Sequence, residues 1–260
     1  MSINVQDVSV RFFGVVALSG VSLALAASEI VAVVGPNGSG KSTLFNSISG
    51  MVQLAGGRIT VEGRDIRGVP PYGRVRLGIA RTLQTPRFDM RESVERAVLC
   101  GFYPVARTGM VGAMLRLPRA AREEGELLES CHDILRDLRL FELRNVPLGE
   151  LSMGQVRMVE VARAIANKPK YLLLDEPAAG LTRREQKILA DEIRRLAAAG
   201  VGVLLVEHNF GLVRDLSQRV LVLDRGSVMM EGAPQEVQAD ESFVSLYLGS
   251  SGKAARGTAA

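Results

Sequence analysis

The sequence has no tryptophan, only two cysteines among its 260 residues, and few aromatic side chains of any kind. Aromatic residues make up 5% of the chain, which argues against an aromatic-rich cage for a ligand. Cys100 and Cys131 are too few for a disulfide framework, and their spacing is not that of metal ligands. We therefore expect both to be small packing residues in a protein of the reducing cytosol.

The chain also lacks an apolar run of the roughly 18 residues needed to cross a bilayer, so any membrane partner is expected to be a separate chain. One segment, Val15 to Ser28, is apolar and contains Ala24-Leu25-Ala26, as the core of a signal peptide does. However, Asp7 interrupts the basic end that such a peptide needs, and Glu29 leads directly into a strand pattern. We expect this segment to belong to the fold.

The overall composition is that of a globular protein. Hydrophobic residues make up 47% of the chain and charged residues 23%, which excludes a disordered, collagen-like or coiled-coil chain. The 32 lysines and arginines exceed the 28 aspartates and glutamates only slightly, giving a net charge of +4. This excess suits an anionic ligand or an anionic membrane surface, and it does not indicate nucleic-acid binding, which needs clustered charge.

Short apolar runs recur along the chain and are separated by helical patterns. The runs are Ile30 to Val34, Leu172 to Leu174, Val201 to Val206 and Val220 to Leu223. Such runs are typical of strands buried on both faces of a parallel sheet. Between two of them, Arg184 to Ala199 has the apolar spacing of an amphipathic helix. The alternation predicts an α/β fold with a parallel sheet.

Two other regions have different patterns. Near the N-terminus, Ile3 to Arg11, Val21 to Leu25 and Arg58 to Glu62 alternate as strands of an antiparallel layer do. Between residues 86 and 149 helical periodicity replaces the strand pattern, with Leu127, Cys131, Ile134 and Leu138 on one stripe. We therefore divide the chain into a first core part (1–85), an inserted helical subdomain (86–150), a second core part (151–248) and a flexible tail (249–260).

A phosphate-binding loop follows the first buried strand and precedes a helix expected over Thr43 to Ser49. Its residues are Gly35, Pro36, Asn37, Gly38, Ser39, Gly40, Lys41 and Ser42. Glycines let the backbone N–H groups approach phosphate oxygens, and the helix N-terminus adds partial positive charge. Lys41 is expected to reach the β- and γ-phosphates of a nucleotide, and the Ser42 hydroxyl to ligate Mg²⁺. The alternative is a glycine-rich turn with a solvated lysine.

Two carboxylates end another buried strand, Tyr171 to Leu174. Asp175 is expected to lie beside the Mg²⁺ of the phosphate loop, and Glu176, one residue further, to polarise the attacking water. A surface acidic pair is the alternative interpretation.

The segment Leu151-Ser152-Met153-Gly154-Gln155 predicts a serine-glycine loop that opens an amphipathic helix. With the two motifs above, this arrangement resembles the ABC transporter ATPases, which have a P-loop NTPase (RecA-like) core. The resemblance implies that Ser152, Gly154 and Gln155 of one subunit cover the nucleotide bound by the other subunit. That nucleotide is held by the phosphate loop and by Thr43, which follows the loop. Met153 and Val156 depart from the usual signature LSGGQQ.

The resemblance implies further roles for single residues. Phe12 stands where an aromatic stacks on adenine; its neighbour Phe13 and an ordinary core phenylalanine are the alternatives. Gln84 matches a glutamine that contacts Mg²⁺ and couples to the membrane subunit, with a solvated loop glutamine as the alternative. His208 is similar to a histidine that contacts the γ-phosphate. Thr182 departs from the acidic or amide residue usual there, which leaves open how this loop organises the opposite site. His132, by contrast, is expected to be structural.

A finer resemblance, to the ATPases of branched-chain amino acid uptake, rests on Arg81 to Gln84, Gly109 to Arg119 and Asp175 to Leu181. Pro86 to Asp89 departs from that pattern. The resemblance implies a bacterial importer subunit for hydrophobic amino acids, or for related amides or urea, that uses ATP and Mg²⁺. It also implies a homodimer, or a heterodimer with a sister ATPase, peripheral at the cytoplasmic face of the plasma membrane. Two permeases and, through them, a periplasmic or extracellular binding protein complete the expected partners.

Three alternatives remain at this stage. The first is an ABC ATPase of another transport system, including an exporter, because the membrane partner sets the direction. The second is a non-transport ABC ATPase acting on DNA or ribosomes, although the long coiled coils or second cassette of such proteins are not seen here. The third is a P-loop kinase or GTPase, which would lack the segment Leu151 to Gln155. We expect no nucleic-acid partner.

Overall fold

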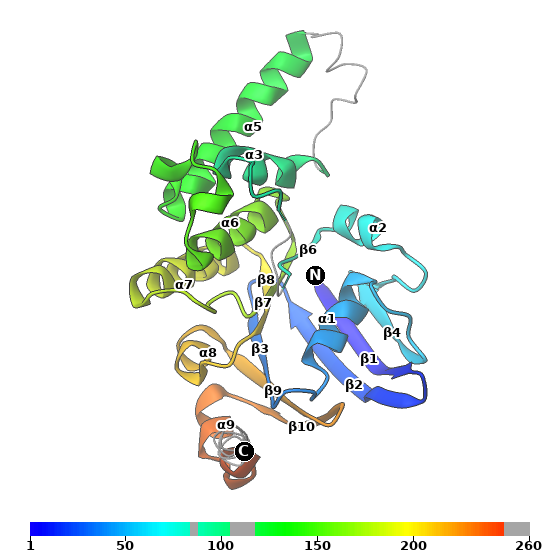
Figure 1. Cartoon of the computed structure of the whole chain (residues 1–260). Coiled ribbons are helices and arrows are strands. Elements are labelled where there is room, and N and C mark those ends of the chain that lie inside the picture. The colour runs from blue at the N-terminus through cyan, green and yellow to red at the C-terminus, as the bar shows by residue number, and fades with distance from the viewer. Residues whose placement is uncertain (84–87, 105–117, 247–260) are drawn as a thin grey trace.

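The computed structural model describes residues 1–83, 88–104 and 118–246. Figure 1 shows two sheets side by side and a group of helices that extends away from them at one end. The smaller sheet has the strand order β2-β1-β4-β5, formed by β1 (Ser2–Phe12), β2 (Val15–Ala26), β4 (Gly56–Val61) and β5 (Arg64–Asp65). These strands pair antiparallel, which confirms the expected N-terminal layer. The apolar segment from Val15 forms strand β2, so it is part of the fold as expected.

The larger sheet carries the predicted apolar strands. Its order is β10-β9-β3-β8-β7-β6, formed by β3 (Ile30–Val34), β6 (Ile79–Arg81), β7 (Tyr171–Asp175), β8 (Gly202–Val206), β9 (Arg219–Asp224) and β10 (Ser227–Gly232). Every residue of β3, β7 and β8 is buried, as their continuous apolar runs predict. The sheet is parallel, as predicted, except at one edge, where β10 pairs antiparallel with β9. Its residues alternate in exposure, as is usual for an antiparallel strand with one solvated face.

Helices cover both faces of the larger sheet. They are α1 (Lys41–Ser49), α2 (Pro71–Arg76), α6 (Met153–Ala166), α7 (Arg183–Ala198), α8 (Phe210–Leu216) and α9 (Pro234–Ala239). One core cluster unites α6 and α7 with residues of β7 and β8, and a second fills the space between the two sheets and α1. Helix α1 begins two residues earlier than expected, at Lys41. Helix α7 agrees with the predicted helix to within one residue at each end.

The inserted region is helical where the structure describes it. It contains α3 (Val94–Leu99), α5 (Pro118–Asp137) and three short 3₁₀ turns, η1 (Cys100–Phe102), η2 (Phe141–Leu143) and η3 (Leu148–Glu150). The predicted stripe on α5 packs into the core, with Cys131, Ile134 and Leu138 buried and Leu127 against them. Figure 1 shows α5 projecting away from the sheets. The proposed tail lies outside the described residues, as does most of Gly109 to Arg119.

The two cysteines have different environments. Cys131 is buried, as expected, whereas Cys100 is exposed, so the prediction that both are packing residues was wrong for Cys100. The reason is local, because the next two residues of the 3₁₀ turn, Gly101 and Phe102, take the buried positions. His132 has the expected structural role: its Nε2 atom lies 2.5 Å from a carboxylate oxygen of Glu95.

Within the described ranges, no helix is both long enough and apolar enough to cross a membrane.

Candidate nucleotide site

The motif residues meet at one edge of the larger sheet. Strands β3, β8 and β7 are neighbours and run parallel, so their carboxyl ends lie together. The phosphate loop follows β3, Asp175 ends β7, and Glu207 and His208 follow β8. This edge is where open α/β sheets bind their ligands.

The phosphate loop needs glycine at two positions for distinct reasons. At Gly35, with φ of 151°, an added Cβ would lie 2.1 Å from the carbonyl oxygen of Leu223. Gly40 precedes helix α1 in a left-handed conformation, with φ of 106°, and gives the helix no side-chain cap. The first turn of α1 also contains no acidic residue. The N–H groups at this helix end are therefore open to an anion.

Lys41 lies folded into this loop. Its Nζ atom donates to the carbonyl oxygens of Gly35 at 2.7 Å and Pro36 at 2.9 Å. Burial lowers the pKa of Lys41, and the negative charges of Glu176 and Asp175 oppose that effect. The lysine of one motif and the two carboxylates of the other are therefore close enough to interact electrostatically.

The loop fits a phosphate group and the oxygen donors fit Mg²⁺. The hydroxyl of Ser39 is buried and has no hydrogen-bond partner, so the loop holds an unused polar group. Ser42 and Asp175 are oxygen ligands of the kind that Mg²⁺ prefers. No group of three or more histidine, cysteine, aspartate or glutamate side chains that could hold a metal ion occurs in the described part of the chain. Mg²⁺ would consequently need phosphate oxygens to complete its ligands, as is usual at nucleotide sites.

Asp175 is held by a residue to which our sequence analysis assigned no role. Arg81, at the end of β6, places its Nη2 atom 3.0 Å from Oδ2 of Asp175, and both side chains are largely buried. The N–H of Asp175 also donates to the hydroxyl of Thr82. Burial raises the pKa of Asp175, and the Arg81 guanidinium opposes this rise. Arg81 thus favours the charged form of the buried carboxylate and fixes its direction.

Arg81 also reaches the helix that follows the phosphate loop. Its Nη1 atom donates to Oδ1 of Asn46 at 2.6 Å and to the hydroxyl of Ser49 at 3.1 Å. One arginine therefore joins the end of β7 to α1, across 94 residues of sequence between Arg81 and Asp175. Such a contact between distant segments leaves no local pattern in the sequence.

Glu176 and His208 face each other. Glu176 has a left-handed backbone, with φ of 49°, and its N–H donates to the carbonyl oxygen of Val206. Its Oε1 atom lies 2.8 Å from Nε2 of His208. Glu207, which precedes His208 in the sequence, is buried, and its carboxylate accepts a hydrogen bond from the N–H of Ala178 at 2.8 Å. Burial raises the pKa of Glu207. Sequence reasoning missed this carboxylate, which fixes the loop after Glu176.

The signature segment is built as a helix start. The Ser152 hydroxyl accepts from the N–H of Gln155, and the Gln155 side chain accepts from the N–H of Ser152, which together form a capping box for α6. Gly154 packs closely on the loop before α7, where an added Cβ would lie 2.9 Å from the carbonyl oxygen of Gly180. No hydrogen bond in the described part of the chain joins this segment to its own phosphate loop.

Thr182 has a structural role within its own subunit. Thr182 is the N-cap of α7: its hydroxyl accepts from the N–H of Glu185, whose carboxylate accepts from the N–H of Thr182. Threonine here stabilises the helix that follows Gly180 and Leu181.

Of the two remaining predicted site residues, Phe12 is described by the structure and Gln84 is not. Phe12 ends β1 and is 41% exposed, so the alternative of a core phenylalanine was wrong. Phe13 is fully exposed in the turn to β2, which leaves both rings accessible. Gln84 lies outside the described residues.

Leu83, the residue before Gln84, is hydrogen-bonded to helix α6, which the signature segment opens. Leu83 donates its N–H to Oε1 of Glu160 at 2.7 Å, and its carbonyl oxygen accepts from Arg157 at 3.3 Å. Glu160 is 1% exposed and burial raises its pKa. The segment leading to Gln84 is therefore tied to α6, a link that the sequence analysis did not anticipate.

Comparison with known proteins agrees with this geometry. Residues 18–179 match the ABC transporter family. The chain is 33% identical over 248 residues to the high-affinity branched-chain amino acid transport ATP-binding protein BraF of Pseudomonas aeruginosa, covering 95% of this chain and 97% of that protein. It is 35% identical over 246 residues to LivG of Salmonella typhimurium, which carries the same description, covering 94% of this chain and 96% of that protein.

Solved structures are similar over nearly the full length. A nucleotide-free ATP-binding cassette from an ABC transporter has a TM-score of 0.82 at 30% identity, covering 95% of this chain and 99% of that one. The ADP conformation of the cassette MJ1267 also has a TM-score of 0.82, at 31% identity, covering 96% of this chain and 99% of that one.

Proposed function

Because the chain belongs to the ABC transporter family and is an ATPase, we propose that it is the ATP-hydrolysing subunit of an importer for branched-chain or other hydrophobic amino acids, or related amides or urea. The names of its relatives, BraF and LivG, support this cargo. The observation that carries the proposal is the meeting of the phosphate loop, Lys41 and two carboxylates at one sheet edge. Another transport system, including an exporter, is the second candidate, since the membrane partner sets direction.

We propose that two copies, or one copy and a sister ATPase, close on two ATP molecules. The signature segment supports this, because Ser152 and Met153 are exposed while Gly154 packs on its own subunit. The N-terminal end of α6 thus points its open N–H groups and the Ser152 hydroxyl outward, where a partner can present a phosphate. The γ-phosphate would be held between the phosphate loop of one subunit and Ser152, Gly154 and Gln155 of the other.

The residues divide the chemistry among them. Glu176 orients the attacking water, and Lys41 and His208 hold the γ-phosphate oxygens. Ser42, Asp175 and Gln84 would hold Mg²⁺, which neutralises charge on the phosphates. Arg81 keeps Asp175 in position, and Phe12 provides a ring for adenine to stack on. Closure on ATP and opening after hydrolysis would drive two separate permeases at the cytoplasmic face of the membrane, fed by a substrate-binding protein.

A mixing experiment tests the shared site. Lys41→Ala removes the phosphate-loop cation, and Ser152→Asp places a negative charge against the phosphate; each variant alone is expected to lose ATP hydrolysis. In a mixed dimer one site combines the intact phosphate loop of the Ser152→Asp chain with the intact signature of the Lys41→Ala chain. Mixing the two should therefore restore hydrolysis, measured as phosphate release. No recovery, with mixed dimers demonstrated by differential tags, would contradict the shared site.

The cargo is tested separately. Cells that carry Glu176→Gln in place of the wild-type chain should lose uptake of labelled leucine, isoleucine and valine, whereas uptake of an unrelated solute such as a sugar should stay the same. Normal uptake of the three amino acids would point to the second candidate, another transport system.

A further inference from the structure

A second pocket lies at the opposite end of β7 from the nucleotide site. It has a volume of about 470 Å³ and is formed by the turn between β4 and β5, by α2, and by the segment between α6 and β7. We call it the basic pocket. The lining residues that matter are Glu62, Arg64, Arg76, Asn167, Lys168 and Lys170. The five residues of β7 separate Lys170 from the catalytic end at Asp175, a length of about 17 Å. Figure 1 shows α2 and β4 on the side of the molecule away from α8 and α9.

The pocket collects positive charge that the described residues do not neutralise. It is lined by four cationic side chains and one carboxylate. The carboxylate of Glu62 accepts from Nζ of Lys170 at 2.9 and 3.0 Å, so it is already paired. The other three cations make no side-chain hydrogen bond or ion pair with any described residue; they are Arg64, Arg76 and Lys168. Cations gathered in this way repel one another, and a bound anion removes that repulsion.

An uncharged group in the pocket wall also lacks a partner. Asn167 is only 7% exposed, and its side-chain oxygen Oδ1 is buried without a hydrogen-bond partner. Its Nδ2 group, which is the part of the amide that can donate to an anion, also makes no hydrogen bond to any described residue. Most buried side-chain polar groups are hydrogen-bonded, to protein or to ordered water. The pocket therefore contains both unneutralised charge and an unused hydrogen-bonding group, contributed by α2, the β4–β5 turn and the end of α6.

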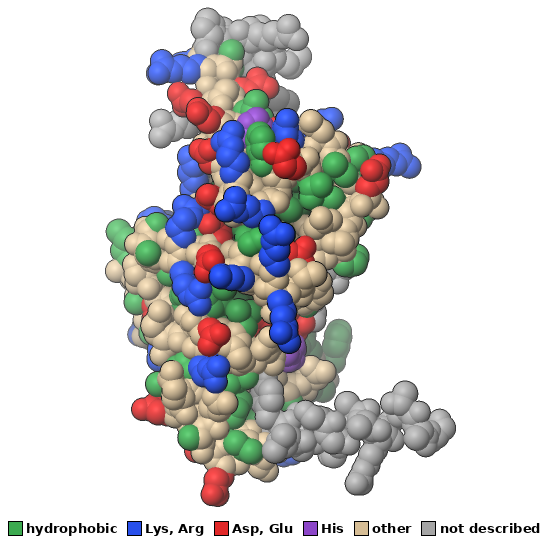
Figure 2. All heavy atoms as spheres, turned by 90° about the vertical axis from the view of Figure 1, so that its left-hand side faces the viewer, with side chains coloured by type: hydrophobic (Ala, Val, Ile, Leu, Met, Phe, Trp, Pro, Cys, Tyr) green, Lys and Arg blue, Asp and Glu red, His purple; other side chains and the backbone are tan. Residues whose placement is uncertain are grey.

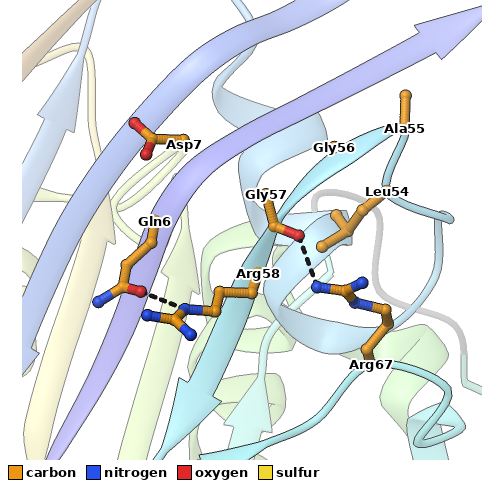
Figure 3. Close-up of a pocket in the computed structure, with 8 residues that line it drawn as sticks. All are labelled: Gln6, Asp7, Leu54, Ala55, Gly56, Gly57, Arg58 and Arg67. Carbon is orange, nitrogen blue, oxygen red and sulfur yellow. Dashed lines mark hydrogen bonds between the residues drawn. The ribbon is translucent and has the colours of Figure 1, made fainter.

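A comparison within the same chain shows what is unusual here. Figure 3 shows another pocket, of about 480 Å³, which is also lined by two arginines, Arg58 and Arg67. There, however, Arg58 donates to the side chain of Gln6, and Arg67 donates to the carbonyl oxygen of Gly57 at 3.0 Å. Asp7 also lines this pocket and adds a negative charge. Its arginines are engaged by the protein, whereas those of the basic pocket are not.

We propose that the basic pocket binds the phosphate group of a small anion that carries at least two negative charges. Phosphate oxygens accept several charged N–H donors at once, and guanidinium groups match them in a bidentate way. The phosphate can belong to a soluble phosphate compound or to a phospholipid headgroup. No residue of this pocket takes part in the nucleotide site, so the proposal stands or falls independently of the proposed function.

The test is a titration of the full chain with sodium phosphate, followed by amide resonances at constant ionic strength. Saturating ADP is present throughout, so that the phosphate loop is already occupied. Because each amide resonance reports on one residue, shifts at the basic pocket can be told apart from shifts at the phosphate loop. The pocket variant is Arg76→Glu with Lys168→Glu, at two exposed side chains without partners. The control variant is Arg58→Glu with Arg67→Glu, which changes the net charge equally in the pocket of Figure 3. A flotation assay with phosphatidylcholine vesicles, with and without phosphatidic acid, distinguishes the sources of phosphate.

We expect saturating shifts at the amides of Gly78, Lys168 and Lys170. Affinity should fall at least about tenfold in the pocket variant and much less in the control, because charge-assisted hydrogen bonds are lost only in the first. If the protein floats with vesicles that contain phosphatidic acid, and only the pocket variant loses this flotation, the ligand is a lipid headgroup. If the protein binds phosphate but does not float with the vesicles, the ligand is a soluble phosphate compound. Shifts confined to the phosphate loop, or equal weakening in both variants, would overturn the proposal.

Discussion

The Nε2 atom of His208 lies 2.8 Å from Oε1 of Glu176, so the two side chains after adjacent strands β8 and β7 form a hydrogen-bonded pair. The histidine side chain is 46% exposed and the carboxylate 21%. Each side chain therefore limits the rotamers of the other while one face of the pair stays open. A carboxylate held in this way is suited to orienting a water molecule at the site entrance.

Glu176→Gln should keep ATP binding and lose about a hundredfold or more in turnover, because the amide is the same size but cannot act as a base. Nucleotide binding is measured by calorimetry and turnover by phosphate release. The matched control is Glu126→Gln, at an exposed carboxylate of α5, which should leave both unchanged. Hydrolysis by Glu176→Gln at the wild-type rate would show that another group orients the water.

Ser152→Asp and Ser152→Asn form a pair that separates charge from helix capping. Aspartate and asparagine both cap helices about as well as serine, so α6 should stay intact in each variant. Only the aspartate adds a negative charge beside the expected phosphate. We expect Ser152→Asp to lose most ATP hydrolysis and Ser152→Asn to keep a substantial part, with equal melting temperatures. Equal activity of the two variants would argue against a phosphate at this helix end.

Arg81→Ala should destabilise the fold by about 3 kcal/mol or more, because it leaves the buried carboxylate of Asp175 without its cation. Chemical denaturation measures the free energy of unfolding. The control is Arg122→Ala, at an exposed ion pair with Glu126, whose loss should cost less than about 1 kcal/mol. Similar costs for the two substitutions would mean that the pair with Asp175 contributes little.

The buried carboxylate of Glu207 leads to a prediction about how the stability of the fold depends on pH. Burial raises its pKa above the ordinary value of 4.5, so the folded state binds this proton more tightly than the unfolded state does. The stabilisation is therefore fully present below pH 4.5 and is lost as the pH rises through the raised pKa. Glu207→Gln has no such proton, and its Oε1 atom can still accept from Ala178. The melting temperature of wild type relative to this variant should fall from acidic to neutral pH; a constant or rising difference would contradict the assignment.

Local pattern was enough to predict the main strands, because a strand buried on both faces must be apolar at every position. Ile30 to Val34 was predicted to the residue, and the run Leu172 to Leu174 was one residue short at each end of the observed strand. Edge elements were harder. Strand β6 has only three residues, which is too few to show a period. In β10 the exposed Met229 stands between Val228 and Met230, so the sequence hides the alternation in exposure. Both strands were missed.

The residues of the candidate nucleotide site were also predictable only where they belong to a local motif. The phosphate loop and the two carboxylates each form a contiguous motif, and their glycines, lysine and acids are dictated by the chemistry of phosphate and Mg²⁺. Arg81, Glu160 and Glu207 escaped notice as site residues because their roles depend on partners in other elements. A buried charge far from its partner in sequence has the same local signature as an exposed one.

By itself, the order of residues determined the alternation of strands and helices, the turn that wraps a phosphate and the positions of its acids, because each depends on neighbours within a few residues. The tertiary structure alone decided which distant groups meet: Arg81 with Asp175, Glu160 with Leu83, and the cations of the basic pocket. It also decided that Cys100 faces solvent while Cys131 is buried. These outcomes depend on strand order and helix packing, which bring together side chains that no short stretch of sequence relates.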